Sequence, residues 1–194
     1  VFIIPFTYLI VTKKIERFIT LRLLVILFFG SLQAFIGWWM VKSGLIDKPD
    51  VSQYRLATHL GNSLLILFLL FWLILDLKNK KSQIKFDLNL VIFLILFITI
   101  IAGSLVAGMD AGLMYNTYPL MNDSFFPIDY LSLGFLDPFE NPGSAQFHHR
   151  HLGLISFIAI GIFFVKNLYK KEVFLELLFL IFLIIIQFLL GVYI

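Results

Sequence analysis

Long apolar runs separated by short polar segments dominate the chain. A helix needs about 20 mostly apolar residues to cross the roughly 30 Å hydrocarbon core of a bilayer. By this measure the pattern predicts the tail of one helix at 1–12 and complete spans at 22–42, 53–77, 87–108, 148–166 and 173–194. Strands of a membrane barrel would alternate apolar and polar residues over about ten positions. These runs are continuously apolar, so the predicted fold class is an all-α, polytopic transmembrane helix bundle.

The composition agrees with a membrane protein. Hydrophobic residues make up 60% of the 194 and charged residues 14%, whereas soluble domains have roughly 45–50% and 25%. The absence of cysteine excludes disulfides, thiolate haem ligands and iron–sulfur clusters supplied by this chain. The sequence starts at Val1 and stops at Ile194 inside apolar runs, so we expect the middle of a longer protein.

The position of the charges predicts the orientation in the membrane. The net charge is +3, but eleven of the 15 basic residues lie in the short segments 13–22, 78–85 and 166–171, so no nucleic-acid partner is expected. Such loops face the cytoplasm or matrix. The segments 43–52 and 109–147 carry Lys48 as their single basic residue, against seven Asp and Glu. We therefore expect both on the periplasmic or intermembrane side of an inner membrane, bacterial or mitochondrial.

The segment 109–147 is long for a connection, and such loops are usually functional or disordered. Its aromatic and aliphatic residues favour order, either as a packed lid or as a segment on the membrane surface. Four prolines divide it into turns. They are Pro119, Pro127, Pro138 and Pro142.

A weak internal repeat is present. The stretches QAFIGWWM at 33–40 and QFLLGVYI at 187–194 share a Gln followed four residues later by a Gly. The same offset of 154 residues places 1–12 on 155–166, and both are helices that run inward to a basic loop. The pattern predicts that each unit of the parent protein has an even number of helices and that the two units lie parallel.

The repeat predicts how the chain is divided. Residues 1–77 belong to the N-terminal half, 78–86 form a cytoplasmic or matrix linker, and 87–194 belong to the C-terminal half with the outer loop 109–147. The offset projects His59 to position 213 and His149 to a position just before Val1, so each half is expected to have two histidine positions.

Two histidines near the outer ends of spans are candidate ligands. His59 follows Arg55 by about one turn, and His149 directly precedes Arg150. Ionisable groups in membrane helices usually face the bundle interior and mark function, and imidazole is a standard axial ligand of haem iron. His59 and His149 are therefore candidate iron ligands, with Arg55 and Arg150 placed for haem propionates. The alternative is an interhelical hydrogen bond for His59 and an Arg55 that snorkels to lipid.

His148 and His151 lie three residues apart and share a helix face. A zinc site would need further ligands, and no HExxH spacing exists, so zinc is the weaker hypothesis. Solvated polarity at a helix cap is the preferred interpretation. Gln33 and Gln187 must find partners in hydrocarbon, and the glycines within the spans would allow close helix approach.

Four segments together resemble one family, haem A synthase. They are LQAFIGWWMVKSGL at 32–45, VSQYRLATHLG at 51–61, AGMDAGLMYNTYPLM at 107–121 and QFHHRHLG at 146–153. The form resembled is the alphaproteobacterial and mitochondrial one; another branch has a cysteine pair that this chain lacks. The resemblance implies eight helices in two parallel four-helix repeats in the parent protein.

The resemblance implies a membrane oxidoreductase that converts the methyl group of haem O to the formyl group of haem A for cytochrome oxidase. It implies that His149 holds a permanent haem b and that His59 serves the substrate haem. Haem O synthase, membrane lipid and an unidentified electron donor are the implied partners. The catalytic Glu of the family is expected upstream of Val1, with Gln146 as its counterpart, so the chain alone is expected to be inactive.

Two other functions agree with the same residues. A bis-His cytochrome b would bind two haems stably and transfer electrons without a substrate. A transporter built on a parallel repeat would use the histidines as proton relays.

Overall fold

The computed structural model describes residues 2–42, 51–79 and 86–193. Within them the regular structure is helical, apart from an isolated β-bridge between Met121 and Ser124. The α-helices are α1 (Ile3–Val11), α2 (Arg17–Val41), α3 (Gln53–Asn79), α4 (Leu88–Gly108), α5 (Asp137–Glu140), α6 (Pro142–Asn167) and α7 (Phe174–Tyr193). The 3₁₀ turns are η1 (Ala111–Leu113), η2 (Gly134–Leu136) and η3 (Lys171–Val173). Five of the helices are long and apolar enough to cross a membrane, which confirms the all-α, polytopic class.

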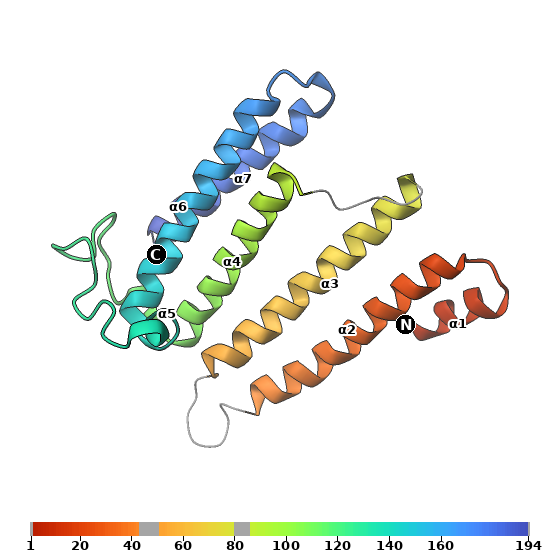
Figure 1. Ribbon diagram of the computed structural model, residues 1–194, viewed down its shortest axis with the longest axis horizontal. Coiled ribbons are helices and arrows are strands. Elements are labelled where there is room, and N and C mark those ends of the chain that lie inside the picture. Colours follow the sequence, from red (N-terminus) through yellow and green to blue (C-terminus); the bar gives the residue numbers. More distant parts are fainter. Residues whose placement is uncertain (1, 43–50, 80–85, 194) are drawn as a thin grey trace.

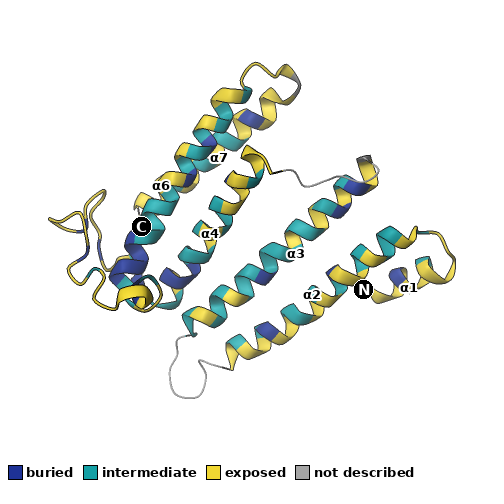
Figure 2. Ribbon diagram, in the orientation of Figure 1, coloured by how far each residue is buried: buried dark blue, intermediate teal, exposed yellow. Residues whose placement is uncertain are grey.

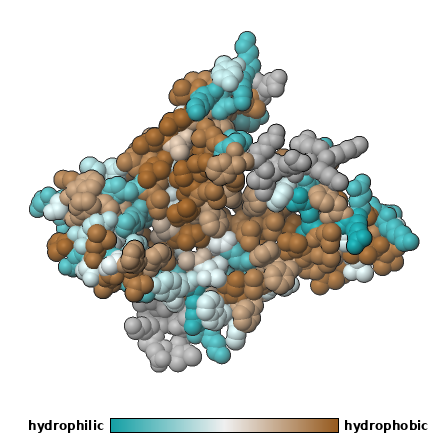
Figure 3. Space-filling view, in the orientation of Figure 1, coloured by the Kyte–Doolittle hydropathy of each residue, from teal (hydrophilic) through white to brown (hydrophobic). Residues whose placement is uncertain are grey.

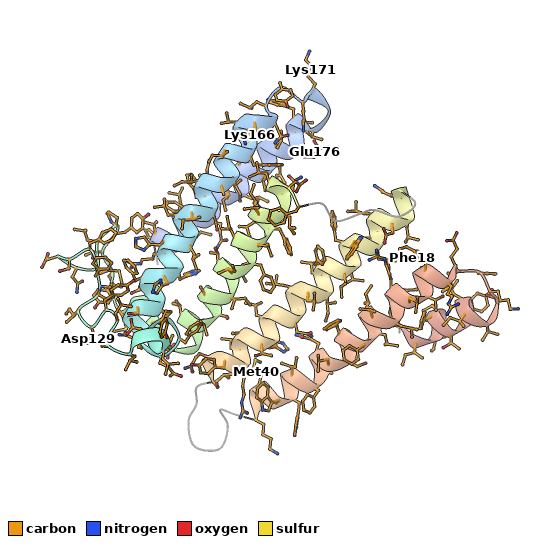
Figure 4. All side chains as sticks on the ribbon, in the orientation of Figure 1. Phe18, Met40, Asp129, Lys166, Lys171 and Glu176 are labelled. Atoms are coloured by element: carbon orange, nitrogen blue, oxygen red, sulfur yellow. The ribbon has the colours of Figure 1, made fainter. Side chains whose placement is uncertain are left out.

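The long helices follow one another side by side, in the order in which they occur along the chain. Contacts link α2 to α3, α3 to α4, α4 to α6 and α6 to α7, and Figure 1 shows neighbouring helices running in alternating directions. The turns after α1 and α6 therefore lie at the opposite end from the loop before α6. Figure 4 shows Lys166 and Lys171 at one end of the helices and Asp129 at the other.

The alternation of the described helices matches the predicted topology, whereas the side of the membrane stays a prediction. The division at 78–86 also stays one, because 80–85 lie outside the described residues, as do the charges predicted at 47, 48 and 50. Many residues of the helices are exposed (Figure 2), and hydrophobic residues predominate over the helices on the face that Figure 3 shows. Lipid tails are as apolar as these side chains, so polar and small residues drive helix association instead.

Two predicted helix starts are wrong. α2 begins at Arg17 rather than at 22, and α6 begins at Pro142 rather than at 148. The stretch 142–147 is not continuously apolar, but Asn141 caps the helix by accepting hydrogen bonds from the amides of Gly143 at 3.0 Å and Ser144 at 3.3 Å. An Asn followed by Pro is the usual start of a helix, and this signal was present in the sequence.

A buried ion pair joins the beginning of α2 to the end of α3. Arg22 Nε lies 2.5 Å from Asp76 Oδ2, and the Asp76 side chain is fully buried. The guanidinium carbon lies 3.9 Å from the ring centre of Trp72 and 4.9 Å from that of Phe18. The sequence pattern had placed Arg22 in a loop, so the pair was not predicted.

Where α3 begins and α4 ends, the two helices are in backbone contact. A Cβ added at Gly108 would lie 2.5 Å from the Cα of Gln53, so only glycine fits there. This contact sets the spacing of the two helices that join the proposed half-bundles. Gly153 and Gly191 have no such role, since a Cβ on either would meet nothing within 4 Å among the described residues.

Candidate histidine sites

His149 lies against the backbone of α4. Its Nδ1 is 3.1 Å from the carbonyl oxygen of Thr99. A carbonyl can only accept a hydrogen bond, so Nδ1 carries the proton and Nε2 of the neutral ring keeps its lone pair. One turn along α4 lies Gly103, where a Cβ would come within 2.8 Å of His149 Cε1.

This arrangement fits a ligand of haem iron. Histidines that bind metals usually donate their second N–H to a carbonyl or carboxylate, which fixes the tautomer and the ring orientation. His149 has that bond, and Gly103 provides the space that the imidazole needs beside α4.

His59 has a similar position between α2 and α3. A Cβ at Gly37 would lie 3.1 Å from His59 Cε1. The amide nitrogen of Gln33, one turn before Gly37, lies 3.2 Å from Nδ1 and 3.1 Å from Nε2 of the ring. In both sites the helix preceding the histidine supplies a polar residue and, four residues later, a glycine. The sequence contains this spacing twice, as Gln33–Gly37 and Thr99–Gly103. It is a signal for the two histidine sites that the sequence analysis does not use.

The two imidazoles differ in whether their hydrogen-bond partners leave a ring nitrogen lone pair free. A side-chain amide nitrogen only donates, so Gln33 occupies a lone pair of His59. Gln33 is itself held, because its Oε1 accepts from Asn62 at 2.5 Å and its Nε2 donates to Ser63 Oγ at 2.5 Å. Gln33 therefore has the hydrogen-bond partners that were predicted for it. Gln187 is exposed among the residues that the structure describes.

Both candidate arginines bind backbone carbonyls near the outer ends of the helices. Arg55 Nη1 donates to the Trp39 carbonyl at 2.8 Å, and the guanidinium lies 4.6 Å from the centre of the Trp39 ring. Arg150 donates to the carbonyls of Tyr115 and Thr117, the latter at 2.7 Å. The predicted contact of these arginines with propionates stays a prediction.

The first part of the outer loop is fastened to α6 beside His149. Gln146 donates to the Gly112 carbonyl at 2.6 Å and to the Tyr115 carbonyl at 3.2 Å, and it accepts from the Tyr115 amide at 3.1 Å. With Arg150 it holds residues 112–117 on the outer part of α6. Gln146 lies three residues before His149 and Arg150 lies one residue after it. A movement of residues 112–117 would therefore act on α6 on both sides of that histidine.

His148 and His151 belong to an aromatic cluster. The ring of His151 lies 4.0 Å from that of Phe147, and its Nδ1 donates to the Phe147 carbonyl at 2.8 Å. His148 lies 5.8 Å from Tyr130. The helix-cap interpretation is wrong, because both residues lie inside α6. The part of the chain that the structure describes contains no group of three or more His, Cys, Asp or Glu able to hold a metal ion, so the zinc hypothesis has no support there.

Asp137 organises the second part of the outer loop. The residue is fully buried, and its carboxylate accepts hydrogen bonds from the amides of Leu131 at 2.9 Å and Leu133 at 3.2 Å and from Asn141 Nδ2 at 3.2 Å. Burial acts to raise the pKa of Asp137, but the hydrogen bonds outweigh it and hold the pKa below the ordinary 3.8. The carboxylate is thus a charged anchor for 131–141.

Replacing Asp137 with alanine is expected to loosen this part of the loop by about 1–3 kcal/mol, the usual loss when buried donors lose their acceptor. Hydrogen exchange at Leu131 and Leu133 should accelerate accordingly. Because the folded pKa is lowered, the contribution is complete at neutral pH and declines as pH falls below about 4. Asp129→Ala, at an exposed position in the same loop, is the control, and equal protection in both variants would contradict the anchoring role.

The fold and the two histidine sites define a polytopic α-helical membrane protein with imidazoles placed between adjacent helices. Residues 1–194 match the COX15-CtaA family, described as cytochrome oxidase assembly protein. The chain belongs to this family, which confirms the resemblance stated above.

Several curated relatives carry the name Heme A synthase. A protein named Heme A synthase from Wolbachia pipientis wMel is 42% identical over 99% of this chain and 56% of its own length. Proteins of that name from Nitrosospira multiformis and Pelagibacter ubique are 40% and 43% identical over 86% of this chain and 49% and 53% of their own lengths. The chain thus spans about half the length of these curated relatives. No solved structure matches it.

Proposed function

We propose that the protein is a haem A synthase, a membrane oxidoreductase that converts the methyl group of haem O to the formyl group of haem A for cytochrome oxidase. The observation that carries the proposal is the alignment of proteins named Heme A synthase along nearly the whole chain, at 42% identity in the Wolbachia pipientis protein. When bound, the haem iron supplies the oxidative chemistry, and the chain binds and orients the macrocycle.

The two histidines are proposed to have different roles. His149 is the ligand of a permanent haem b, supported by the Thr99 bond that leaves its Nε2 lone pair available. His59 serves the substrate haem, supported by the Gln33 amide that the incoming group must displace from the ring. A histidine that is hydrogen-bonded within the protein when no haem is bound suits a substrate haem that binds and dissociates.

The remaining polar groups support these sites. Arg55 and Arg150 are proposed to approach the propionates with donors that the backbone carbonyls leave free, because a guanidinium has five N–H groups. Gln146 and Arg150 also hold residues 112–117 over the outer part of α6, where the loop would keep water from the site.

We propose the inner membrane of a bacterium or mitochondrion as the location, with the loops 43–52 and 109–147 on the periplasmic or intermembrane side. The basic segments then face the cytoplasm or matrix, as the positive-inside rule requires. Haem O synthase is the proposed supplier of substrate, and a separate electron donor completes the reaction.

Replacing His59 with alanine in the full-length protein is expected to abolish haem A formation, because the substrate loses its ligand. The measurement is haem extraction from cells that make haem O, with His151→Ala as the matched control, since His151 bonds within its own helix. Two stably bound haems and no haem A from the unaltered protein would favour a cytochrome b and overturn the proposal. Haem A in undiminished amount from His59→Ala would refute the assigned role.

A further inference from the structure

The outer loop contains an apolar surface that neither histidine site uses. We call residues 128–139 the outer apolar segment. Phe135 is 100% exposed and Ile128 85% exposed, and four further apolar side chains are exposed beside them. These four are Leu131, Leu133, Leu136 and Phe139. An exposed apolar patch of this kind marks contact with a partner or a membrane.

The segment buries a charged group and exposes apolar side chains, which is the reverse of a loop in water. The carboxylate of Asp137 is buried and accepts hydrogen bonds from the backbone, while the leucines around it point outward. Hydrogen bonding inside and apolar groups outside is the arrangement that a non-aqueous medium favours. The segment is therefore built to contact an apolar phase.

The segment is attached where α3 begins and α4 ends. Glu140, directly after it, accepts hydrogen bonds from Tyr54 Oη and, at 3.4 Å, from Gln53 Nε2. Gln53 is the first residue of α3 and touches the last residue of α4, Gly108. Figure 1 shows α5 beside this end of the helices. The segment is thus fixed to the start of one candidate membrane span, next to the end of another.

Charge argues against a headgroup-binding or basic docking surface. The stretch 109–149 contains no Lys or Arg, and Asp129 is the exposed carboxylate within the segment. Contact must therefore come from burial of apolar groups, as in monotopic segments that lie in the interface plane.

We propose that the outer apolar segment inserts its side chains into the outer leaflet of the bilayer. It forms an interfacial anchor that is fixed to α6 through Asp137 and Asn141 and to α3 through Glu140. The anchor holds the outer loop close to the bundle, on the side where both histidines lie. A protein partner would cover the same surface without lipid contact, and this is the alternative that the experiment separates.

The test uses spin labels, since the chain has no cysteine of its own. Phe135→Cys and, independently, Ile128→Cys are labelled with a nitroxide in the full-length protein, with any cysteine outside residues 1–194 replaced by serine. The protein is reconstituted in phosphatidylcholine vesicles. Collision of each label with oxygen, which concentrates in lipid, is compared with collision with a water-soluble nickel chelate by power-saturation EPR.

Both labels are expected to collide more with oxygen than with nickel. The matched control, Asp123→Cys, lies at an exposed position of the same loop outside the segment and should show the reverse. Preference for nickel at 135 and 128 would overturn the proposal in favour of water. An immobile label that neither reagent reaches would overturn it in favour of protein, from a partner or another part of the chain.

Discussion

Replacing Gly103 with alanine is expected to lower the affinity of the full-length protein for the proposed haem b by about 10–100-fold, the usual loss when a residue that orients a metal ligand changes. The new Cβ would lie 2.8 Å from His149 Cε1, so the imidazole has to rotate away from α4. That rotation breaks its bond to the Thr99 carbonyl. The measurement is a haem titration of purified apoprotein, followed by the Soret absorbance.

The loss should be confined to the haem site, because the new methyl group meets a side chain and not a backbone. Gly161→Ala is the matched control on α6, since a Cβ there meets nothing within 4 Å of the described residues. His149→Ala defines complete loss of the ligand. An unchanged haem affinity in Gly103→Ala would contradict the proposed use of His149.

Replacing Arg22 with leucine is expected to destabilise the protein by about 3–5 kcal/mol, the range for removing one partner of a buried ion pair. Asp76 has a fully buried side chain, so the loss of Arg22 leaves its charge poorly compensated in a low-dielectric region. The contacts of the guanidinium with Trp72 and Phe18 are lost as well. The measurement is the free energy of unfolding in a mild detergent titrated with SDS.

The double variant Arg22→Leu/Asp76→Leu separates the pair from ordinary packing. Removing both charges should restore most of the stability, because well-packed apolar groups often replace a buried pair at little cost. Arg17→Leu changes an exposed arginine of the same helix and should have little effect. If the double variant is less stable than Arg22→Leu, the attraction between the charges is not what links α2 to α3.

Several features were predictable because each depends on neighbouring residues along the chain. The spans follow from the length of apolar runs, and the alternating topology follows from the basic residues of the short loops. His59 and His149 were identifiable as candidate ligands, because an ionisable group in hydrocarbon is costly and so is rarely without a function. The start of α6 does not follow from apolar length, because the Asn141–Pro142 cap begins the helix before the apolar run.

The sequence by itself therefore determined the fold class, and it predicted His59 and His149 as iron ligands. Only the tertiary structure decided which partners they have, because these lie on other helices. Thr99 leaves one ring nitrogen of His149 available, whereas Gln33 donates a hydrogen bond to the ring of His59. These partners lie 50 and 26 residues away along the chain, so the sequence alone does not reveal the difference. The same holds for the Arg22–Asp76 pair and for the buried carboxylate of Asp137. The environment of a polar group depends on what surrounds it in space, and that decides whether it binds, anchors or holds helices together.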